Sequence, residues 1–209
     1  MLSKKLLISL VLLMNSLWSD DNILYMINQG VPAIKEMLKE VSVQKRYKKN
    51  RTLLHYAVQK RDFELVSFLV KEKILLSARG GDYNNTPLQD SISYGYLRIA
   101  HYLIKKGTPL NLKNIYGQTA LHIASSRGYD GLVKELLTYG ADRTTIDNSG
   151  YRAYELIPRL SFGNRKKLKK LLEINSNLTK KKKSYKESIF IDKRSKINNS
   201  IIGIQIEEE

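Results

Sequence analysis

Cysteine is absent from the sequence, tryptophan occurs once and proline four times. The absence of cysteine excludes disulfide bonds, thiolate metal sites and cysteine nucleophiles throughout the chain. The apolar run near the N-terminus, Leu6 to Met14, has nine residues. A comfortable membrane span needs about 20, so this run is too short for one. Hydrophobic residues nevertheless make up 42% of the 209 positions, which is enough for most of the chain to fold.

Sequence motifs of common enzyme classes are also missing. The chain has no His-Glu-x-x-His, no glycine-rich phosphate loop and no Gly-x-Ser-x-Gly. The adjacent carboxylates Asp20 and Asp21 have no other feature that supports a role as an acid–base pair. We therefore expect a protein that is not an enzyme, with no catalytic residue, no cofactor and no metal site.

The N-terminal segment has the organisation of a secretory signal peptide. Lys4-Lys5 precedes the apolar run, and Ser19 lies directly before two acidic residues. Cleavage is expected after Ser19, with Ser16 as the second choice, although Leu17 is a poor residue two places before Ser19. This predicts a bacterial protein that is exported, periplasmic or secreted, with no membrane span left after removal of the leader. An uncleaved anchor, or a first helix of the folded domain, is the alternative.

The net charge of +16 indicates attraction to anionic surfaces such as phosphates, lipids or acidic polymers. Residues 165–209 hold 13 Lys and Arg against six Asp and Glu. The remaining excess is spread over the leader and the central region. A lysine-rich coding bias of an AT-rich genome explains the same composition, and the sequence leaves both explanations open.

A seven-residue phrase recurs along the chain. Its four copies begin at Arg51-Thr52, Asn85-Thr86, Gln118-Thr119 and Tyr151-Arg152, so that the second positions are 34, 33 and 33 residues apart. A constant period near 33 residues is typical of a stacked array of repeats rather than of a single core.

Each copy predicts a helix, a short turn and a second helix. In the third copy, Thr119 caps the first helix and Ala120 to Ala124 supply its apolar stripe. The second helices are expected at 63–72, 97–106 and 131–139. Glycine, which tolerates the left-handed conformation, marks the turns and the helix ends at Gly95, Gly107, Gly128 and Gly140.

The phrase Thr-Pro-Leu-His-x-Ala, the glycine turn and the closing Gly140-Ala141-Asp142 resemble the ankyrin repeat, over about residues 20 to 176. The resemblance implies an all-α solenoid of stacked helix–turn–helix units with short hairpin loops. The sequence departs from the family pattern at Leu53 and Ala120, which replace proline, at Gln89, which replaces histidine, and at Lys73, which replaces glycine. The segment 73–85 is one residue longer than its counterparts. These departures affect the local geometry expected for the first two repeats, not the fold.

Short helix pairs cannot bury enough apolar surface alone, so the ends of the array need closing units. We expect degenerate helices at 21–29 and 31–40, and a fourth copy that carries Pro158 within its first helix and has a second helix at 164–174. The predicted organisation is a signal peptide (1–19), an N-terminal capping repeat (20–48), three repeats (49–147, divided as 49–81, 82–114 and 115–147), a C-terminal capping repeat (148–176) and a basic, disordered tail (177–209).

Three histidines could attract a chemical interpretation. His55 and His122 hold the fourth place of the phrase, where the resemblance implies a structural bridge between the capping threonine and the next loop. His101 lies within a second helix and is expected to pack. We therefore expect a structural role within the repeats for Thr52, His55, Thr86, Thr119, His122 and the four glycines named above.

Tyrosine dominates the aromatic residues, with 13 against four phenylalanines and one tryptophan. Tyrosine is favoured where an apolar body meets water, as at binding surfaces. Several tyrosines fall where ankyrin-like arrays expose variable residues, before the capping threonine or at the end of the first helix; simple covering of a neighbouring repeat is the alternative. The candidate partner-binding residues are Tyr47, Lys48, Arg51, Lys60, Tyr83, Asn85, Tyr94, Ile115, Tyr116, Gln118, Arg127 and Tyr151.

These observations predict a non-catalytic scaffold that binds a protein partner, of unknown identity, on the concave face of the array in the periplasm or outside the cell. A monomer is expected. One alternative is binding of an anionic polymer or membrane surface through the basic segment 165–196; nucleic acid is the less favoured target, since a leader would carry the protein away from the cytosol. A secreted effector is a further alternative, by family analogy alone.

Overall fold

The computed structural model describes residues 20–39 and 41–158, together with 166, 170 and 172. The chain divides into two units, 1–168 and 169–209, and the description below concerns the first. The predicted signal peptide, the basic tail and the helix expected at 164–174 fall on residues that lie, wholly or almost wholly, outside this description. They stay predictions.

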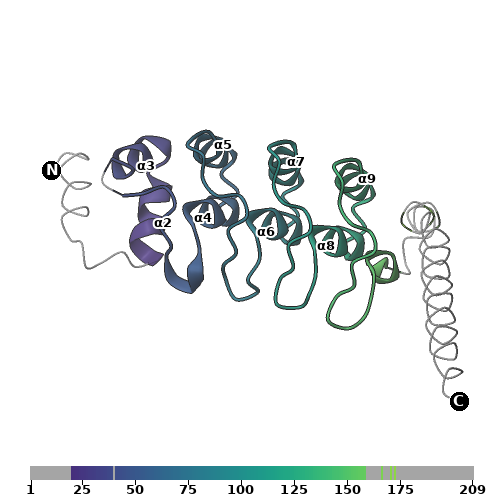
Figure 1. The fold of residues 1–209 in the computed structure, drawn as a ribbon. Coiled ribbons are helices and arrows are strands. Elements are labelled where there is room, and N and C mark those ends of the chain that lie inside the picture. Colours follow the sequence, from purple (N-terminus) through teal and green to yellow (C-terminus); the bar gives the residue numbers. More distant parts are fainter. Residues whose placement is uncertain (1–19, 40, 159–165, 167–169, 171, 173–209) are drawn as a thin grey trace, which may run out of the picture. The chain divides into compact units, whose positions relative to one another are not determined.

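The described part is helical, with two isolated bridges between Gly80 and Asn85 and between Ile146 and Arg152 and no strand. The predicted all-α solenoid is confirmed (Figure 1). In chain order, the elements are α2 (Asp20–Asn28), α3 (Val31–Met37), η1 (Lys48–Asn50), α4 (Leu53–Gln59), α5 (Phe63–Lys71), α6 (Pro87–Ser93), α7 (Leu97–Lys105), α8 (Ala120–Ser126), α9 (Asp130–Thr138) and η2 (Ala153–Leu156).

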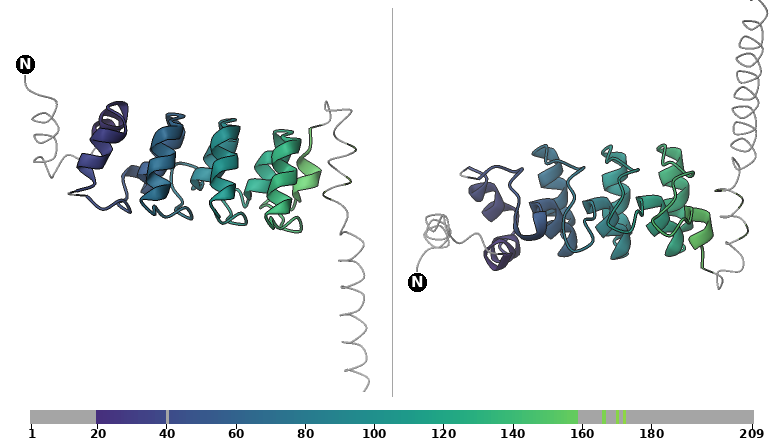
Figure 2. Two further views of the ribbon diagram at one scale, coloured as in Figure 1. Left: turned by 90° about the horizontal axis from the view of Figure 1, so that it is seen from above. Right: turned by 60° about the horizontal axis from the view of Figure 1, so that its bottom comes forward.

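The helices form two layers. α4, α6 and α8 contact one another in sequence to form a first-helix row, which η2 extends beyond α8. The second-helix row contains α5, α7 and α9, each packed on the first helix of its own pair. α2 contacts α4 and α3 contacts α5, so the N-terminal pair stacks on the first repeat. The loops that precede the first helices project from the first-helix row on the side away from the second row (Figures 1 and 2).

The core lies between the two rows because the apolar residues follow the helical period. In α7, Ile99, Ala100 and Leu103 are buried at spacings of one, three and four residues, and Leu121 and Ala124 of α8 are fully buried. Burial of one such leucine contributes about 2 kcal/mol. Seven to nine residues bury too little for an independent unit, so each pair depends on its neighbours.

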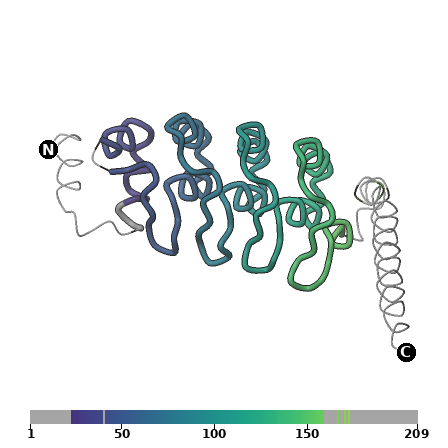
Figure 3. Tube along the Cα trace, in the orientation of Figure 1, coloured from purple at the N-terminus to yellow at the C-terminus, as the bar shows by residue number. Residues whose placement is uncertain are grey.

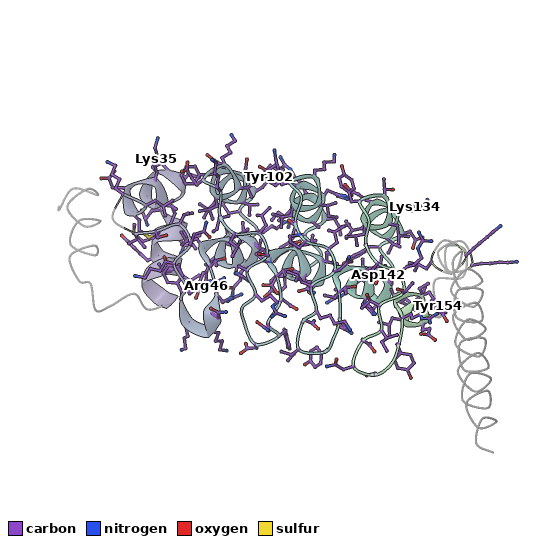
Figure 4. The ribbon with its side chains drawn as sticks, viewed as in Figure 1. Lys35, Arg46, Tyr102, Lys134, Asp142 and Tyr154 are labelled. Carbon is purple, nitrogen blue, oxygen red and sulfur yellow. The ribbon has the colours of Figure 1, made fainter. Side chains whose placement is uncertain are left out.

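Aromatic and polar contacts connect the helices of the second row. The rings of Phe63 and Tyr102 meet edge-on with centroids 5.3 Å apart, and the Tyr102 hydroxyl lies 3.4 Å from Ser67 Oγ. Figure 4 shows Tyr102 in this row. His101 of α7 contacts the Glu135 carboxylate of α9, so this histidine joins two repeats.

One departure from the repeat pattern is absorbed by backbone conformation. Gly107 and Gly140 follow α7 and α9 with φ of 79° and 89°. Lys73, which holds the corresponding place after α5, adopts φ of 59°. Left-handed φ costs a residue with a side chain roughly 1 kcal/mol, so the substitution lowers stability without changing the path of the chain.

The fourth copy differs from our prediction. Pro158 does not lie within a helix, because η2 is a single 3₁₀ turn that ends at Leu156. Ile157 is extended, with φ of −65° and ψ of 125°. The proline ring disfavours the helical conformation of the residue before it, which explains why the helix stops there.

The loops of the array are hairpins closed by one backbone hydrogen bond each. Three of them enclose three residues, but the second encloses four, 81–84, which locates the extra residue expected in segment 73–85 at the tip of this loop. The closing bonds run from Tyr47 N to Arg51 O (2.8 Å), Gly80 N to Asn85 O (2.9 Å), Asn114 N to Gln118 O (3.0 Å) and Asp147 N to Tyr151 O (2.9 Å).

Adjacent loops are also bonded to one another. Each successive loop donates one backbone N–H to a carbonyl of the loop before it, and Figure 3 shows the loops side by side. These bonds are Gly81 N to Lys49 O (2.9 Å), Ile115 N to Tyr83 O (3.0 Å) and Asn148 N to Tyr116 O (3.0 Å). Side chains add further links, since Arg79 donates to Lys113 O (3.0 Å) and Lys113 to Ile146 O (2.8 Å). The four loops therefore form one hydrogen-bonded ladder.

Candidate protein-binding surface

The fourth residue of each phrase connects two repeats. His55 Nδ1 lies 3.1 Å from Thr52 N and 2.9 Å from Thr52 Oγ1, and its Nε2 lies 3.0 Å from Asn85 O in the next loop. A carbonyl only accepts, so Nε2 carries the hydrogen and Nδ1 accepts from the threonine. We call this residue, with its threonine and the carbonyl it reaches, the inter-repeat joint.

His122 forms the same joint in the third repeat. Its Nδ1 lies 3.3 Å from Thr119 N and its Nε2 lies 3.2 Å from Tyr151 O. Burial lowers the pKa of His55 to about 4 and also lowers the pKa of His122, so both rings are neutral at physiological pH. This geometry agrees with the structural role predicted for the two histidines.

Gln89 completes the joint of the second repeat without a histidine. Its Oε1 accepts from Thr86 N at 2.8 Å, while its Nε2 donates to Leu112 O at 2.8 Å and to Gln118 O at 2.9 Å. The amide thus supplies one acceptor and one donor at the places of the two imidazole nitrogens. The departure from the repeat pattern at this position is chemically conservative.

The surface formed by the loop tips and the ends of the first helices, which we call the loop–helix face, presents a row of aromatic side chains. Tyr83, Tyr116 and Tyr151 are 51–53% exposed at successive loops, and Ile115 and Tyr94 are 48% and 46% exposed. The rings of Tyr83 and Tyr116 lie 5.8 Å apart. Lys48, Lys60 and Arg127 are also exposed on this face.

Two predicted contact residues are buried, and their assignment was wrong. Tyr47 is 8% exposed and packs edge-on against Tyr56, with centroids 6.0 Å apart. Asn85 is 3% exposed and donates to Asp90 Oδ1 at 2.9 Å, while its own Oδ1 accepts from Asn114 Nδ2 at 3.1 Å. Both residues hold loops in place. Gln118 is half-buried, and its backbone carbonyl accepts a hydrogen bond from Gln89 Nε2.

A hollow of about 250 Å³, which the sequence did not predict, opens between the first two loops. Arg51, Lys48 and Lys49 line it from the first loop, Asp82 and Tyr83 from the second, and Asp90 from α6. Its signals in the sequence are the extra residue in the second loop and an aspartate at a place where the other copies have Tyr56 and Ile123. Among the residues that the structure describes, no cluster of three or more His, Asp or Glu could hold a metal ion.

Two family models match this chain. The model for ankyrin repeats in three copies matches residues 23–114, and a model for ankyrin repeats in many copies matches residues 103–157. The chain belongs to the ankyrin repeat family. Ankyrin repeats generally mediate protein–protein interactions, and the family is typically non-catalytic.

Ankyrin proteins of very different organisms resemble parts of the chain. An ankyrin repeat-containing protein of Caenorhabditis elegans is 44% identical over 55 residues, which cover 26% of this chain and 5% of that protein. A putative ankyrin repeat protein of fowlpox virus is 33% identical over 95 residues, covering 44% of this chain and 14% of its own length. The human palmitoyltransferase ZDHHC13 is 32% identical over 77 residues, or 37% and 12% of the two chains. The matches thus span a small part of each relative.

The ankyrin phrase accounts for the residues predicted as structural. Thr52, Thr86 and Thr119 are the N-cap residues of α4, α6 and α8. Gly95 and Gly128 adopt φ of 76° and 70° in the turns between paired helices. Within the described ranges, no helix is both long and apolar enough to cross a membrane.

Proposed function

We propose that the protein is a non-catalytic scaffold that binds a protein partner on its loop–helix face. The observation that carries the proposal is the row of half-exposed tyrosines in successive loops of the ladder, Tyr83 and Tyr116 within their loops and Tyr151 at the closing position of the last. Each tyrosine offers a large apolar ring with a hydroxyl that can bond to the partner.

Tyrosine is among the residues that contribute most to binding free energy at interfaces. The ladder fixes the loop backbones before any partner arrives, so less conformational entropy is lost on binding. The basic side chains of Lys48, Lys60 and Arg127 border the tyrosines and favour a partner with an acidic surface.

Replacing Tyr83, Tyr116 and Tyr151 together with alanine should abolish recovery of the partner in a pull-down. Three truncated interface tyrosines together weaken an interface by roughly 3 kcal/mol or more, which is over a hundredfold in affinity. Helical content by circular dichroism should be unchanged, because these side chains are half-exposed.

Tyr139 provides the matched control. It is 50% exposed but follows α9 in the second-helix row. Tyr139→Ala should leave partner recovery unchanged. Equal recovery by the triple variant and the wild type would exclude the loop–helix face as the binding site.

We further propose that the protein acts outside the cytoplasm of a bacterium, in the periplasm or beyond it. The basis is the leader-like organisation of residues 1–19. N-terminal sequencing of the protein from periplasmic and medium fractions should give a mature chain that begins at Asp20. A chain that begins at Met1 and stays in the cytosol would overturn this proposal without affecting the binding surface.

A further inference from the structure

Three departures from the repeat meet at the hollow between the first two loops. The second loop has its extra residue here, and Asp90 takes the place of Tyr56 and Ile123. Gly80 stands where the other loops have a side chain. A Cβ at this position would lie 2.6 Å from Asn50 O and 2.9 Å from Arg51 N, so only glycine allows the two backbones to approach this closely. The three departures therefore coincide at one inter-repeat position of the described array.

Arg51 is the central cation of this hollow and lacks a carboxylate partner. Its guanidinium donates to the neutral side chain of Gln59 at 2.8 Å and lies 5.0 Å from the ring centroid of Tyr56. Within the described part of the chain, the carboxylate of Asp82 pairs with Lys49, and no carboxylate lies within ion-pair distance of Arg51. The hydrogen bond and the ring fix the position of this charge, and no described carboxylate forms a direct ion pair with it.

Asp90 lies at the floor of the hollow and is 5% exposed. Its carboxylate accepts from Asn85 Nδ2 at 2.9 Å. Burial raises the pKa of Asp90 to about 6, and the hydrogen bond from Asn85 and the nearby charge of Arg51 oppose this rise. Since Lys49 and Asp82 compensate each other, Lys48 and Arg51 leave the hollow with a net positive charge.

We infer that this hollow accepts the carboxylate side chain of an aspartate or glutamate from the protein partner. This inference rests on the proposed function, and it names the chemistry of one anchor residue of that partner. Arginine and carboxylate form strong, directional hydrogen bonds, and Tyr83 and Tyr94 border the site with aromatic surface. The negative floor at Asp90 disfavours the doubly charged phosphate of a phosphopeptide relative to a singly charged carboxylate.

The test uses random-sequence peptides displayed on phage and selected on the full chain. Enriched peptides should contain an acidic residue, and its replacement by the matching amide should weaken binding about tenfold, measured by fluorescence anisotropy with synthetic peptides. Arg51→Gln should weaken binding of the acidic peptide about tenfold. It should also remove the difference in affinity between the acidic peptide and its amide counterpart. Lys134→Gln, a loss of the same charge on α9 in the second-helix row (Figure 4), should change the affinity less than about twofold.

Asp90→Asn gives a result of opposite sign. The asparagine still accepts from Asn85 but removes the negative floor, so the acidic peptide should bind several-fold more tightly. A general disturbance of the fold would weaken binding in both variants. Selected peptides that keep their affinity when the acid is neutralised, or an Arg51→Gln variant that behaves like Lys134→Gln, would overturn the inference.

The outcomes separate this inference from the proposed function. Peptides that lose affinity with Tyr83→Ala and Tyr116→Ala but not with Arg51→Gln would preserve the binding surface and reject the carboxylate site. Failure of any peptide to bind the loop–helix face would reject both. Arg51-dependent binding of a phosphopeptide or of single-stranded DNA, without binding of acidic peptides, would replace the carboxylate with a phosphate.

Discussion

Replacing His55 with leucine should lower the free energy of unfolding by roughly 3 to 5 kcal/mol, whereas His55→Gln should cost less than about 1 kcal/mol. Leucine fills a similar volume but leaves Thr52 N buried without its partner, and Thr52 Oγ1 and Asn85 O each lose one hydrogen bond to the ring, although Asn85 O keeps its bond from Gly80 N. An unpaired buried donor costs about 1–3 kcal/mol, and each further lost hydrogen bond costs about 1 kcal/mol. Glutamine restores one acceptor and one donor, as Gln89 does in the next repeat.

Denaturant unfolding of the full chain at neutral pH measures both values. Gln89→Leu is the matched variant at the second joint and should cost about as much as His55→Leu. If leucine and glutamine at position 55 were equally well tolerated, the joint would contribute packing rather than hydrogen bonds.

The difference in stability between His55→Gln and the wild type should shift by about 3 kcal/mol in favour of the variant as the pH falls from 7 to 4. The pKa of His55 is about 4 in the folded chain and 6.5 when unperturbed, and burial is the main cause of the decrease. Below pH 6.5 the unfolded state therefore binds a proton that the folded state does not. The contribution of this histidine to the free energy of unfolding is complete above pH 6.5 and is lost as the pH falls towards 4.

Asp90 acts in the opposite direction over the same range. Its pKa is raised to about 6 by burial, so the folded state binds a proton before the unfolded state, and acidification below pH 6 increases its contribution. The wild-type profile is the sum of the two opposing effects and of His122, whose pKa is also lowered. Only comparison with variants separates them.

The measurement is the free energy of unfolding of three proteins at several pH values between 4 and 7. As the pH falls towards 4, the free energy of unfolding of His55→Gln should rise by about 3 kcal/mol relative to that of the wild type. The free energy of unfolding of Asp90→Asn should fall by about 3 kcal/mol relative to that of the wild type. Parallel profiles for the wild type and His55→Gln would show that the buried imidazole takes up its proton as easily when folded as when unfolded.

The repeating part of the fold could be predicted from the sequence because it depends on local chemistry. A threonine cap, an apolar stripe and a glycine stop act over a few residues, so each copy predicts its own helix pair. The phrase also located the joints at His55 and His122. The exception is Pro158. The register of the repeat predicted a helix through this residue, but the proline stops the helix and η2 ends at Leu156.

The binding surface was predictable only in part because exposure depends on the neighbouring loop. Tyr47 and Tyr116 are both expected in loops from the sequence, but Tyr47 packs edge-on against Tyr56 and is buried. The hollow depends on a close approach of the backbone at Gly80 and Asn50, residues 30 positions apart, and a single glycine gives no sign of this. The aspartate at position 90 was visible in the sequence as a polar residue in an apolar place.

The backbone hydrogen bonds of the loop ladder couple the positions of neighbouring loops. Each tip is bonded through its backbone to the next, from Lys49 through Gly81, Tyr83 and Ile115 to Asn148. A displacement of one loop must therefore bend or break a bond to its neighbour, and the loops resist independent motion. An insertion that would be harmless in an isolated hairpin displaces the neighbouring loops here through these bonds. A residue that never touches a partner can therefore still alter the spacing of the residues that do.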